Sequence, residues 1–210
     1  MAISLIKSYT MASGRLLRIV EYPKKILRTE CMPVPDATEP RIQELIRDMI
    51  STVRYHDGLG LAAPQVGEPY RLFVMRTPAR VVGGRAGRKR FVRTKRYHAC
   101  INPKIKRFSE DQQIYAESCL SIPDQQFLVR RKYGIQSAYT TADNEIVHRT
   151  WEGLPAVVFQ HELDHLDGVL IPDREVSVSP GDYDEEFFAA QERTMSGLVK
   201  WYNEDPWEAR

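Results

Sequence analysis

The sequence predicts a single α+β domain in which antiparallel β-sheets surround a central helix that carries an HExxH motif. Two observations support this prediction. Short β-like runs follow one another through the middle of the chain, and helical periodicity is confined to a few segments, so helices and strands do not alternate. The 210 residues, of which 42% are hydrophobic and 28% charged, suffice for one domain with a buried core.

The first helix is predicted over residues 41–55, where apolar residues recur at helical spacing. Thr38 is the candidate cap at its start, and Gly58 ends it. A glycine-rich loop over residues 58–65 and a strand around residues 71–75 follow. This stretch therefore predicts one helix, one loop and the first strand of a sheet.

Further β-like runs are predicted downstream, separated by turn residues such as Asn102-Pro103 and Ala142-Asp143-Asn144. They lie near residues 99–101, 104–108, 114–118, 127–131, 135–139 and 145–151. Pro155 can open a helix over residues 156–166, which Gly168 ends. A last amphipathic helix is predicted in the acidic tail, over residues 183–203.

The charge of the chain is distributed unevenly. Residues 69–109 contain thirteen Lys or Arg and no acid, whereas residues 173–210 contain ten acids and four bases. We expect residues 1–18 to form an N-terminal extension and residues 80–97 a basic loop. Such a loop can contact nucleic-acid phosphates, which would permit transient contact with the ribosome. The alternative is a solvated, glycine-rich hairpin.

Cysteine usage and hydropathy bear on the location of the protein. The chain has three cysteines, which is an odd number and too few for a disulfide framework. This indicates a reducing compartment. No apolar run approaches the roughly 20 residues that a membrane-spanning helix needs. We expect a cytoplasmic protein, with an organellar location as the alternative because the first 20 residues contain no acid.

The run Gln160-His161-Glu162-Leu163-Asp164-His165 contains the HExxH pattern. On a helix, His161 and His165 share one face, so both imidazoles can reach a single divalent metal. Glu162 lies close enough to act on a water molecule at that metal. A chance match on a polar helix is the alternative. The apolar residues before the motif indicate a buried helix, in which two histidines without a metal would need other partners.

The residue pattern leaves the third metal ligand open. Zincin-type sites need three protein ligands and leave the fourth position for water. Cys119 stands out because it follows a strand-like run that ends in a proline turn, and a thiolate is a good ligand for zinc or iron. A buried structural thiol is the alternative for Cys119. The other candidate ligands are Glu117, Asp164, Asp167, His56, His98 and His148.

Three motifs in order give the chain a resemblance to the peptide deformylase family. The family has a GxGLAAPQ-type loop, an EGCLS-type strand and an HExxDH helix. The chain has Gly58-Leu59-Gly60-Leu61-Ala62-Ala63-Pro64-Gln65, Glu117-Ser118-Cys119-Leu120-Ser121 and the HExxH run above. The resemblance extends over about residues 19–173.

The resemblance implies a role for each motif residue. Cys119, His161 and His165 would hold the metal, and Glu162 would move a proton from water to the leaving amine. Gln65 and the backbone N–H of Leu120 would stabilise the oxyanion. Gly60 would allow close approach of an extended substrate. The residues Leu59, Leu154, Val157 and Val158 are candidates for the pocket that takes the methionine side chain.

The resemblance also implies the metal and the substrate. The metal would be Fe²⁺, with Zn²⁺, Ni²⁺ or Co²⁺ able to replace it, and the substrate an N-formylmethionyl nascent chain that yields formate. Ser118 departs from the family, which usually has glycine there, and a positive φ would strain a serine. Gln126 stands where many members have arginine, and the acidic tail differs from the basic C-terminal helix of some bacterial members.

Two other functions are compatible with parts of this pattern. The first is a zincin-type peptidase with a distant carboxylate as third ligand, in which Cys119 would be dispensable. The second is a deformylase-like binding protein that contacts the ribosome or RNA through the basic loop. The presence of Glu162, Gln65 and all three ligands argues against the second function.

Overall fold

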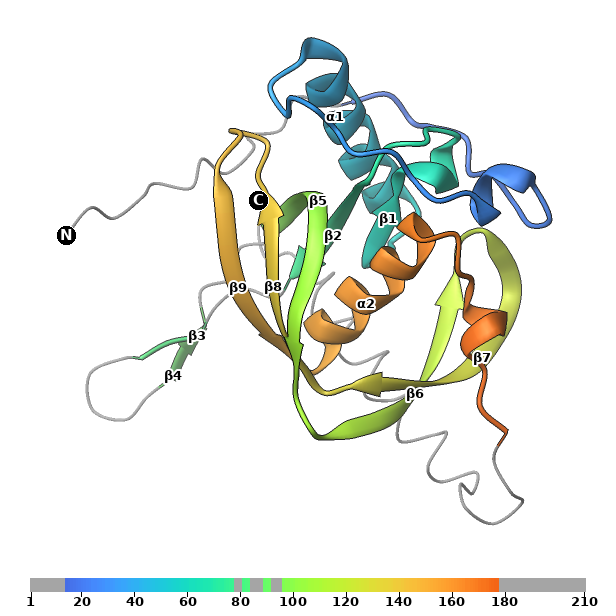
Figure 1. Ribbon diagram of the computed structural model, residues 1–210, viewed down its shortest axis with the longest axis vertical. Coiled ribbons are helices and arrows are strands. Elements are labelled where there is room, and N and C mark those ends of the chain that lie inside the picture. The colour runs from blue at the N-terminus through green and yellow to red at the C-terminus, as the bar shows by residue number, and fades with distance from the viewer. Residues whose placement is uncertain (1–13, 78–80, 84–88, 92–95, 178–210) are drawn as a thin grey trace, which may run out of the picture.

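The computed structural model describes residues 14–77, 81–83, 89–91 and 96–177 (Figure 1). The predicted acidic helix over residues 183–203 lies outside the described residues. Most of the predicted basic loop does too, except for the backbone of the short antiparallel strands β3 (Val81–Gly83) and β4 (Lys89–Phe91). No helix in the described part of the chain is long and apolar enough to cross a membrane.

A five-stranded antiparallel sheet forms one side of the molecule, with the order β1-β2-β5-β8-β9. Its strands are β1 (Gly60–Ala62), β2 (Leu72–Thr77), β5 (Arg96–Phe108), β8 (Gly134–Thr140) and β9 (Ile146–Glu152). Strands β6 (Gln112–Cys119) and β7 (Ile122–Lys132) form a separate antiparallel hairpin. The α+β class and the antiparallel sheets are therefore as predicted.

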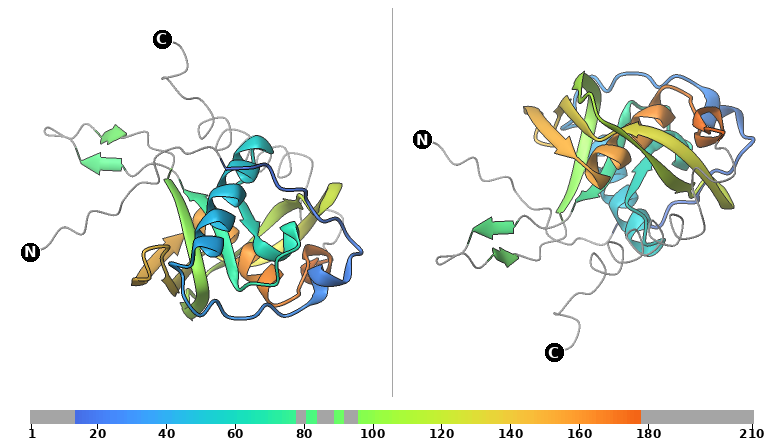
Figure 2. Two further views of the ribbon diagram at one scale, coloured as in Figure 1. Left: turned by 90° about the horizontal axis from the view of Figure 1, so that it is seen from above. Right: turned by 90° about the horizontal axis from the view of Figure 1, so that it is seen from below.

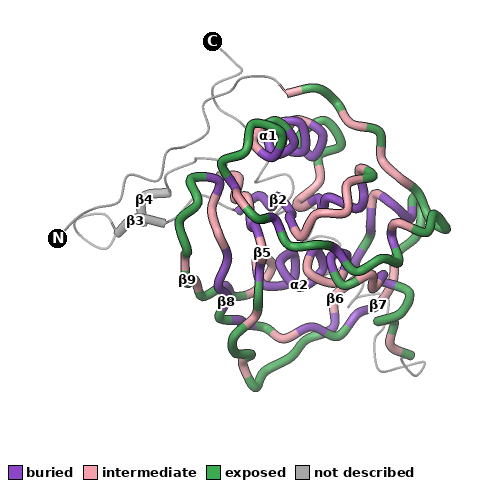
Figure 3. The backbone as a smooth tube through the Cα atoms, turned by 45° about the horizontal axis from the view of Figure 1, so that its top comes forward, coloured by how far each residue is buried: buried purple, intermediate pink, exposed green. Residues whose placement is uncertain are grey.

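Helix α2 (Leu154–Leu166) lies between the five-stranded sheet and the β6–β7 hairpin (Figure 1). The helix is almost wholly buried, whereas the edge strand β9 is mostly exposed (Figure 3). Phe159 anchors α2 to the sheet, because its ring meets the ring of Phe73 edge to face at 5.0 Å. Burial on both sides explains why this helix is apolar around most of its circumference.

Helix α1 (Pro40–Tyr55) packs its apolar face against β1 and β2. It begins as predicted, but its cap differs. Glu39 occupies the cap position and makes no side-chain cap hydrogen bond, while the Thr38 hydroxyl donates to Asp36 instead. Pro40 in the first turn compensates, because it has no N–H that needs a partner.

The predicted turn at Asn102-Pro103 is wrong, because β5 continues through it as one strand. Asn102 has a φ of +50°, and the register between β5 and β8 shifts there. The side chain of Asn102 accepts a hydrogen bond from Val34 N–H and donates one to Val34 C=O, at 2.9 and 2.8 Å. The turn signal in the sequence therefore marks a β-bulge that holds the N-terminal segment.

The predicted proline turn after Cys119 is also placed differently. Cys119 pairs with Ile122, so the hairpin turn is formed by Leu120 and Ser121, and Pro123 lies inside β7. The loop predicted over residues 58–65 likewise contains strand β1 and a 3₁₀ turn, η2 (Ala63–Val66).

The segment before α1, drawn in blue in Figure 2, joins α1 to the β6–β7 hairpin through hydrogen bonds. Backbone N–H groups of Arg15 and Leu17 donate to side chains of α1. Further along, Val20 N–H donates to the Gln65 carbonyl at 2.7 Å, and Tyr22 N–H donates to the Ser121 carbonyl at 2.9 Å. Residues 14–18, assigned to an extension from the sequence, are thus hydrogen-bonded to α1.

Replacing Asn102 with alanine should lower the free energy of unfolding by about 3 kcal/mol, because Val34 loses two hydrogen bonds and alanine disfavours the left-handed backbone. The matched control is Asn144→Ala, since Asn144 also has a positive φ, +63°, but lies exposed in the β8–β9 turn. The control should lose only about 1 kcal/mol. Urea unfolding measures both, and equal losses would contradict the role given to the Val34 contacts.

Candidate metal centre

The β6–β7 hairpin and helix α2 bring together three side chains that could hold a metal ion. One ligand atom from each of Cys119, His161 and His165 lies within 4.8 Å of the others. The Cys119 Sγ and the His165 Nε2 are 3.2 Å apart. Among the residues that the structure describes, no other group of His, Cys, Asp and Glu meets this criterion. One thiolate and two imidazoles form a donor set that suits zinc or iron.

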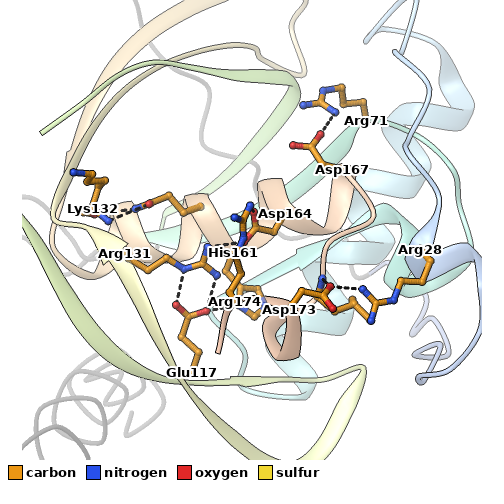
Figure 4. Close-up of polar contacts among 12 residues, drawn as sticks. Arg28, Arg71, Glu117, Arg131, Lys132, His161, Asp164, Asp167, Asp173 and Arg174 are labelled. Carbon is orange, nitrogen blue, oxygen red and sulfur yellow. Dashed lines mark hydrogen bonds and ion pairs between the residues drawn. The ribbon is translucent and has the colours of Figure 1, made fainter. Parts of the chain in front are cut away.

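Glu117 fixes the orientation of His161. Its carboxylate lies 2.8 Å from the His161 Nδ1, so a proton on Nδ1 is held by Glu117 and the Nε2 lone pair is directed to the opposite side. Arg131 donates two hydrogen bonds to Glu117, at 2.7 and 3.0 Å, and a third to Asp164 at 2.5 Å (Figure 4). This network connects β6, β7 and α2 directly behind the metal ligands.

The network also sets the charge of these groups. Burial alone would raise the pKa of Glu117, but hydrogen bonds from Arg131 and His161 outweigh it and lower that pKa. Burial opposes a charge on His161, yet its contacts with Cys119 and Glu117 raise its pKa. Burial lowers the pKa of His165, so this imidazole is neutral and its ring nitrogen can bind a metal. The residues present thus fit a divalent metal.

Glu162 is buried at the edge of this group. Its exposed fraction is 4%, and its Oε2 has no hydrogen-bond partner in the described part of the chain. Burial raises the pKa of Glu162 to about 7. A carboxyl group with this pKa can both accept and return a proton near neutral pH.

Gly60 provides the space that Glu162 occupies. A Cβ atom on Gly60 would lie 2.2 Å from the Glu162 Oε1, which no side chain can tolerate without movement. The sequence predicted Gly60 as a point of close substrate approach. The structure adds a second requirement, since any larger residue would displace Glu162.

Gln65 lies beside the thiol with a defined orientation. Its Oε1 accepts a hydrogen bond from Ala62 N–H at 2.8 Å, which directs Nε2 toward the metal ligands. Nε2 donates to the Cys119 Sγ at 3.4 Å and to the Ser121 Oγ at 3.3 Å. Leu120 N–H donates to no acceptor among the described residues. The sequence did not single out Ser121, because a serine in a hairpin turn carries no distinguishing signal.

A cleft of about 540 Å³ opens onto this group, and most of the residues predicted for the site line it. His165 lies behind the cleft, fully buried. The remaining candidates line the cleft together: Leu59, Gly60, Gln65, Cys119, Leu120, Leu154, Val157, Val158, His161 and Glu162. Leu59, Leu154, Val157 and Val158 give this cleft an apolar wall.

The alternative third ligands have other roles. Asp164 pairs with Arg131 and Arg174, and Asp167 pairs with Arg71 (Figure 4). His98 is hydrogen-bonded to Thr77, and His56 lies exposed at the mouth of the cleft. His148 lies on β9, outside the cleft. These positions leave Cys119 as the third ligand candidate.

Ser118 does not have the positive φ that would strain a serine at this position. Among described residues other than glycine, a positive φ is confined to Asp57, Asn102, Asp124 and Asn144. Ser118 lies in strand β6 with its side chain exposed at the cleft. Serine is therefore accommodated without backbone strain.

The HExxH helix, a cysteine and two histidines around one point, and a cleft beside a buried glutamate define a metal-dependent hydrolase. A family model described as polypeptide deformylase matches residues 16–180. The peptide deformylase of Wolbachia pipientis subsp. Culex pipiens (strain wPip) is 40% identical over 155 residues, covering 73% of this chain and 84% of that protein. The enzyme of Rhodopseudomonas palustris (strain BisB5) is 37% identical over 158 residues, covering 75% and 85%.

Solved structures agree with these relatives. Peptide deformylase from Thermotoga maritima superimposes with a TM-score of 0.66 at 35% identity, covering 78% of this chain and all of that chain. The Met-Ala-Ser-bound class I type b enzyme from Acinetobacter baumannii has a TM-score of 0.66 at 29% identity, covering 77% and 99%. The chain belongs to the peptide deformylase family and is an enzyme that removes the formyl group from the N-terminus of nascent polypeptides.

Replacing Glu117 with glutamine should lower the affinity for Zn²⁺ by about 10- to 100-fold, because the buried partner that orients His161 loses its charge. The matched control is Asp164→Asn, which also removes a negative charge next to Arg131 but does not contact His161. Competition with a chelator of known affinity measures both. Equal losses in the two variants would show that the charge facing Arg131 matters, and not the orientation of His161.

Replacing Gly60 with alanine should reduce kcat by about 100-fold, because the new methyl group forces Glu162 out of position. Gly134→Ala is the control, since a Cβ there would meet only ordinary contacts, the nearest at 3.5 Å. Formate release from a formyl-Met peptide gives kcat. Full activity of the Gly60→Ala enzyme would contradict the arrangement of Gly60 and Glu162.

Proposed function

We propose that this chain hydrolyses the formamide bond of N-formylmethionyl nascent chains with Cys119, His161 and His165 as metal ligands and Glu162 as the proton carrier. The observation that carries the proposal is the buried, unpartnered Oε2 of Glu162, which lies in the cleft next to the three ligands. The Acinetobacter relative solved with Met-Ala-Ser supports a peptide in this cleft.

A divalent metal bound at these ligands would supply Lewis-acid activation of water and of the formyl oxygen. Glu162 accepts a proton from the attacking water and passes it to the amine that leaves, so that formate and a free amino terminus result. A new C–O bond forms to the formyl carbon, and the C–N bond breaks. The raised pKa of Glu162, about 7, favours both proton steps near neutral pH.

Two donors are suited to the negative charge that develops on the formyl oxygen. Leu120 N–H is without an acceptor in the described part of the chain, and the contacts of Gln65 Nε2 are long, at 3.3 and 3.4 Å. Both can therefore donate to the substrate at little cost. The apolar wall formed by Leu59, Leu154, Val157 and Val158 would receive the methionine side chain.

Fe²⁺ is our proposal for the metal in the cell, on the strength of the family resemblance. Zn²⁺, Ni²⁺ and Co²⁺ share the same ligand preferences, so metal availability would decide occupancy. Transient ribosome contact through residues 80–97 stays a prediction, because the side chains of residues 80–96 lie outside the described residues. The cytoplasmic location stays a prediction as well.

Replacing Glu162 with glutamine should lower kcat for a formyl-Met-Ala-Ser peptide by about 10²- to 10⁴-fold while the metal content is kept. Cys119→Ser is the complementary variant and should lose metal as well as activity. Formate release and metal analysis, on enzyme loaded anaerobically with iron or with nickel, separate the two effects. Unchanged kcat in the Glu162→Gln enzyme, or cleavage of internal peptide bonds that survives Cys119→Ser, would refute the proposal.

A further inference from the structure

Arg76 is a charged side chain that is buried outside the metal centre. The buried Asp, Glu, Lys and Arg side chains in the described part of the chain are Asp48, Arg76, Glu117, Arg131 and Glu162. Three of them belong to the metal centre, and Asp48 is hydrogen-bonded to the segment before α1. A guanidinium stays charged in a protein, so the burial of Arg76 has to be compensated by a partner.

The partner of Arg76 belongs to a loop that lines the cleft. Residues 57–60, the cleft loop, lead from the end of α1 into strand β1, and all four line the cleft. The Arg76 Nη1 lies 3.6 Å from the Asp57 Oδ1, and the Arg76 N–H donates to the Leu59 carbonyl at 2.7 Å. Arg76 therefore connects the cleft loop to strand β2 through both its side chain and its backbone.

Tyr97 holds Arg76 from the other side. It lies directly opposite Arg76 in the register between β2 and β5. Burial raises the pKa of Tyr97, and the charge and a hydrogen bond of Arg76 partly offset this rise. The guanidinium is thus fixed between the sheet and the cleft loop.

Asp57 keeps its carboxylate at a position that favours glycine. Its N–H donates to the Arg54 carbonyl, and the Gly58 N–H donates to the Val53 carbonyl. These two bonds end α1 in a Schellman motif, in which the residue at the Asp57 position is left-handed and usually glycine. Asp57 has a φ of +56°. The contact with Arg76 accounts for a carboxylate at this point.

The cleft loop carries the groups that shape the site around the substrate. Leu59 is part of the apolar wall, and Gly60 leaves the space that Glu162 occupies. A Cβ on Gly58 would lie 3.6 Å from a methyl carbon of Leu120, so the loop also lies against the turn of the β6–β7 hairpin. A displacement of about 1 Å in such a site can lower the rate by about 100-fold.

We infer that Arg76 is a positioning residue for the reaction, which acts through Asp57 to hold the cleft loop against the substrate. Arg76 is not among the described residues that line the cleft, so it acts on the substrate only through the loop. This inference rests on the proposed function, because it assigns the substrate to this cleft. Since Leu59 would contact the first side chain, loss of the ion pair should weaken the advantage of methionine over alanine there.

The test compares kcat/KM for formyl-Met-Ala-Ser and formyl-Ala-Ala-Ser in wild type, Arg76→Met, Asp57→Asn and the double variant. Asparagine tolerates the left-handed backbone and removes only the charge. Each single variant should lower the methionine-to-alanine ratio by about fivefold. The double variant should lower it no further, because both changes remove one contact.

Hydrogen exchange gives a second readout that does not depend on turnover. Exchange should become faster at residues 57–61 in Arg76→Met and Asp57→Asn, and stay unchanged in α2. Arg76→Lys keeps the charge and should retain more of the wild-type ratio than Arg76→Met. A residue that contributes only to global stability would leave the ratio unchanged.

The matched control is Arg41→Met, which removes the ion pair between Arg41 and Glu68, at 3.0 Å and outside the cleft. It should keep the wild-type ratio. An unchanged ratio in Arg76→Met, losses that multiply in the double variant, or the same loss in the control would overturn the inference. Should Arg76→Met not fold, Asp57→Asn decides in the same way, because Asp57 is half-exposed.

A binding measurement separates this inference from the proposed function. Calorimetry with the peptides Met-Ala-Ser and Ala-Ala-Ser, on zinc-loaded protein, reports the position of the loop without turnover. A binding ratio that falls in Asp57→Asn, in a protein that releases no formate, would support the role of Arg76 and refute the proposed function. Formate release with the same ratio in wild type and both single variants would do the reverse.

Discussion

The carboxylate of Glu117, buried between Arg131 and His161, is the contact on which the metal site depends. It joins the strand that carries Cys119 to the helix that carries both histidines, and Arg131 extends the connection to Asp164. Burying a carboxylate and a guanidinium costs much of what their attraction returns, and well-packed apolar residues of similar size often stabilise a fold equally well. Orientation of His161 is therefore the better explanation for these charges than stability. Strands β6 and β7 and helix α2 are thus fixed relative to one another at the place where Cys119, His161 and His165 meet.

The position of Glu162, the proposed proton carrier, depends on the space around it. Glu162 directly follows His161 on helix α2, so its direction is set by the helix, and strand β1 must leave room for it. Gly60 does so, because a Cβ there would overlap the Glu162 carboxylate. The result is a buried acid with a raised pKa that faces a cleft, and not a salt bridge. Its lack of a protein partner leaves it available to the substrate.

Local patterns in the sequence predict much of this protein. The periodicity of residues 41–55 predicts α1, and the apolar run before His161 predicts a buried helix. The HExxH spacing predicts that His161 and His165 lie together with Glu162 beside them, because residues four apart on a helix are about one turn apart, and the structure places them so. Cys119 and Gln65 could be assigned only through ordered motifs that resemble a family, since their contact crosses 54 positions of the chain.

Contacts between distant segments explain what the sequence does not predict. Asn102-Pro103 has the composition of a turn, yet hydrogen bonds from Asn102 to Val34 hold it as a bulge within β5. Glu117 was one of several candidate ligands, and its contacts with Arg131 across the hairpin and with the His161 Nδ1 show that it orients His161 instead. The lining of the cleft likewise brings together Glu21 and Asp124, which are remote in sequence. Strand register and side-chain partners of this kind follow from tertiary packing.

The central claim is that one thiolate and two imidazoles hold the metal, oriented from behind by Glu117. X-ray absorption at the zinc edge of zinc-loaded protein tests it most directly, because sulfur and imidazole give distinct scattering. The account predicts one sulfur and two imidazole nitrogens at the metal, with the sulfur lost in the Cys119→Ser protein. A shell of nitrogen and oxygen alone in the wild-type protein would contradict it.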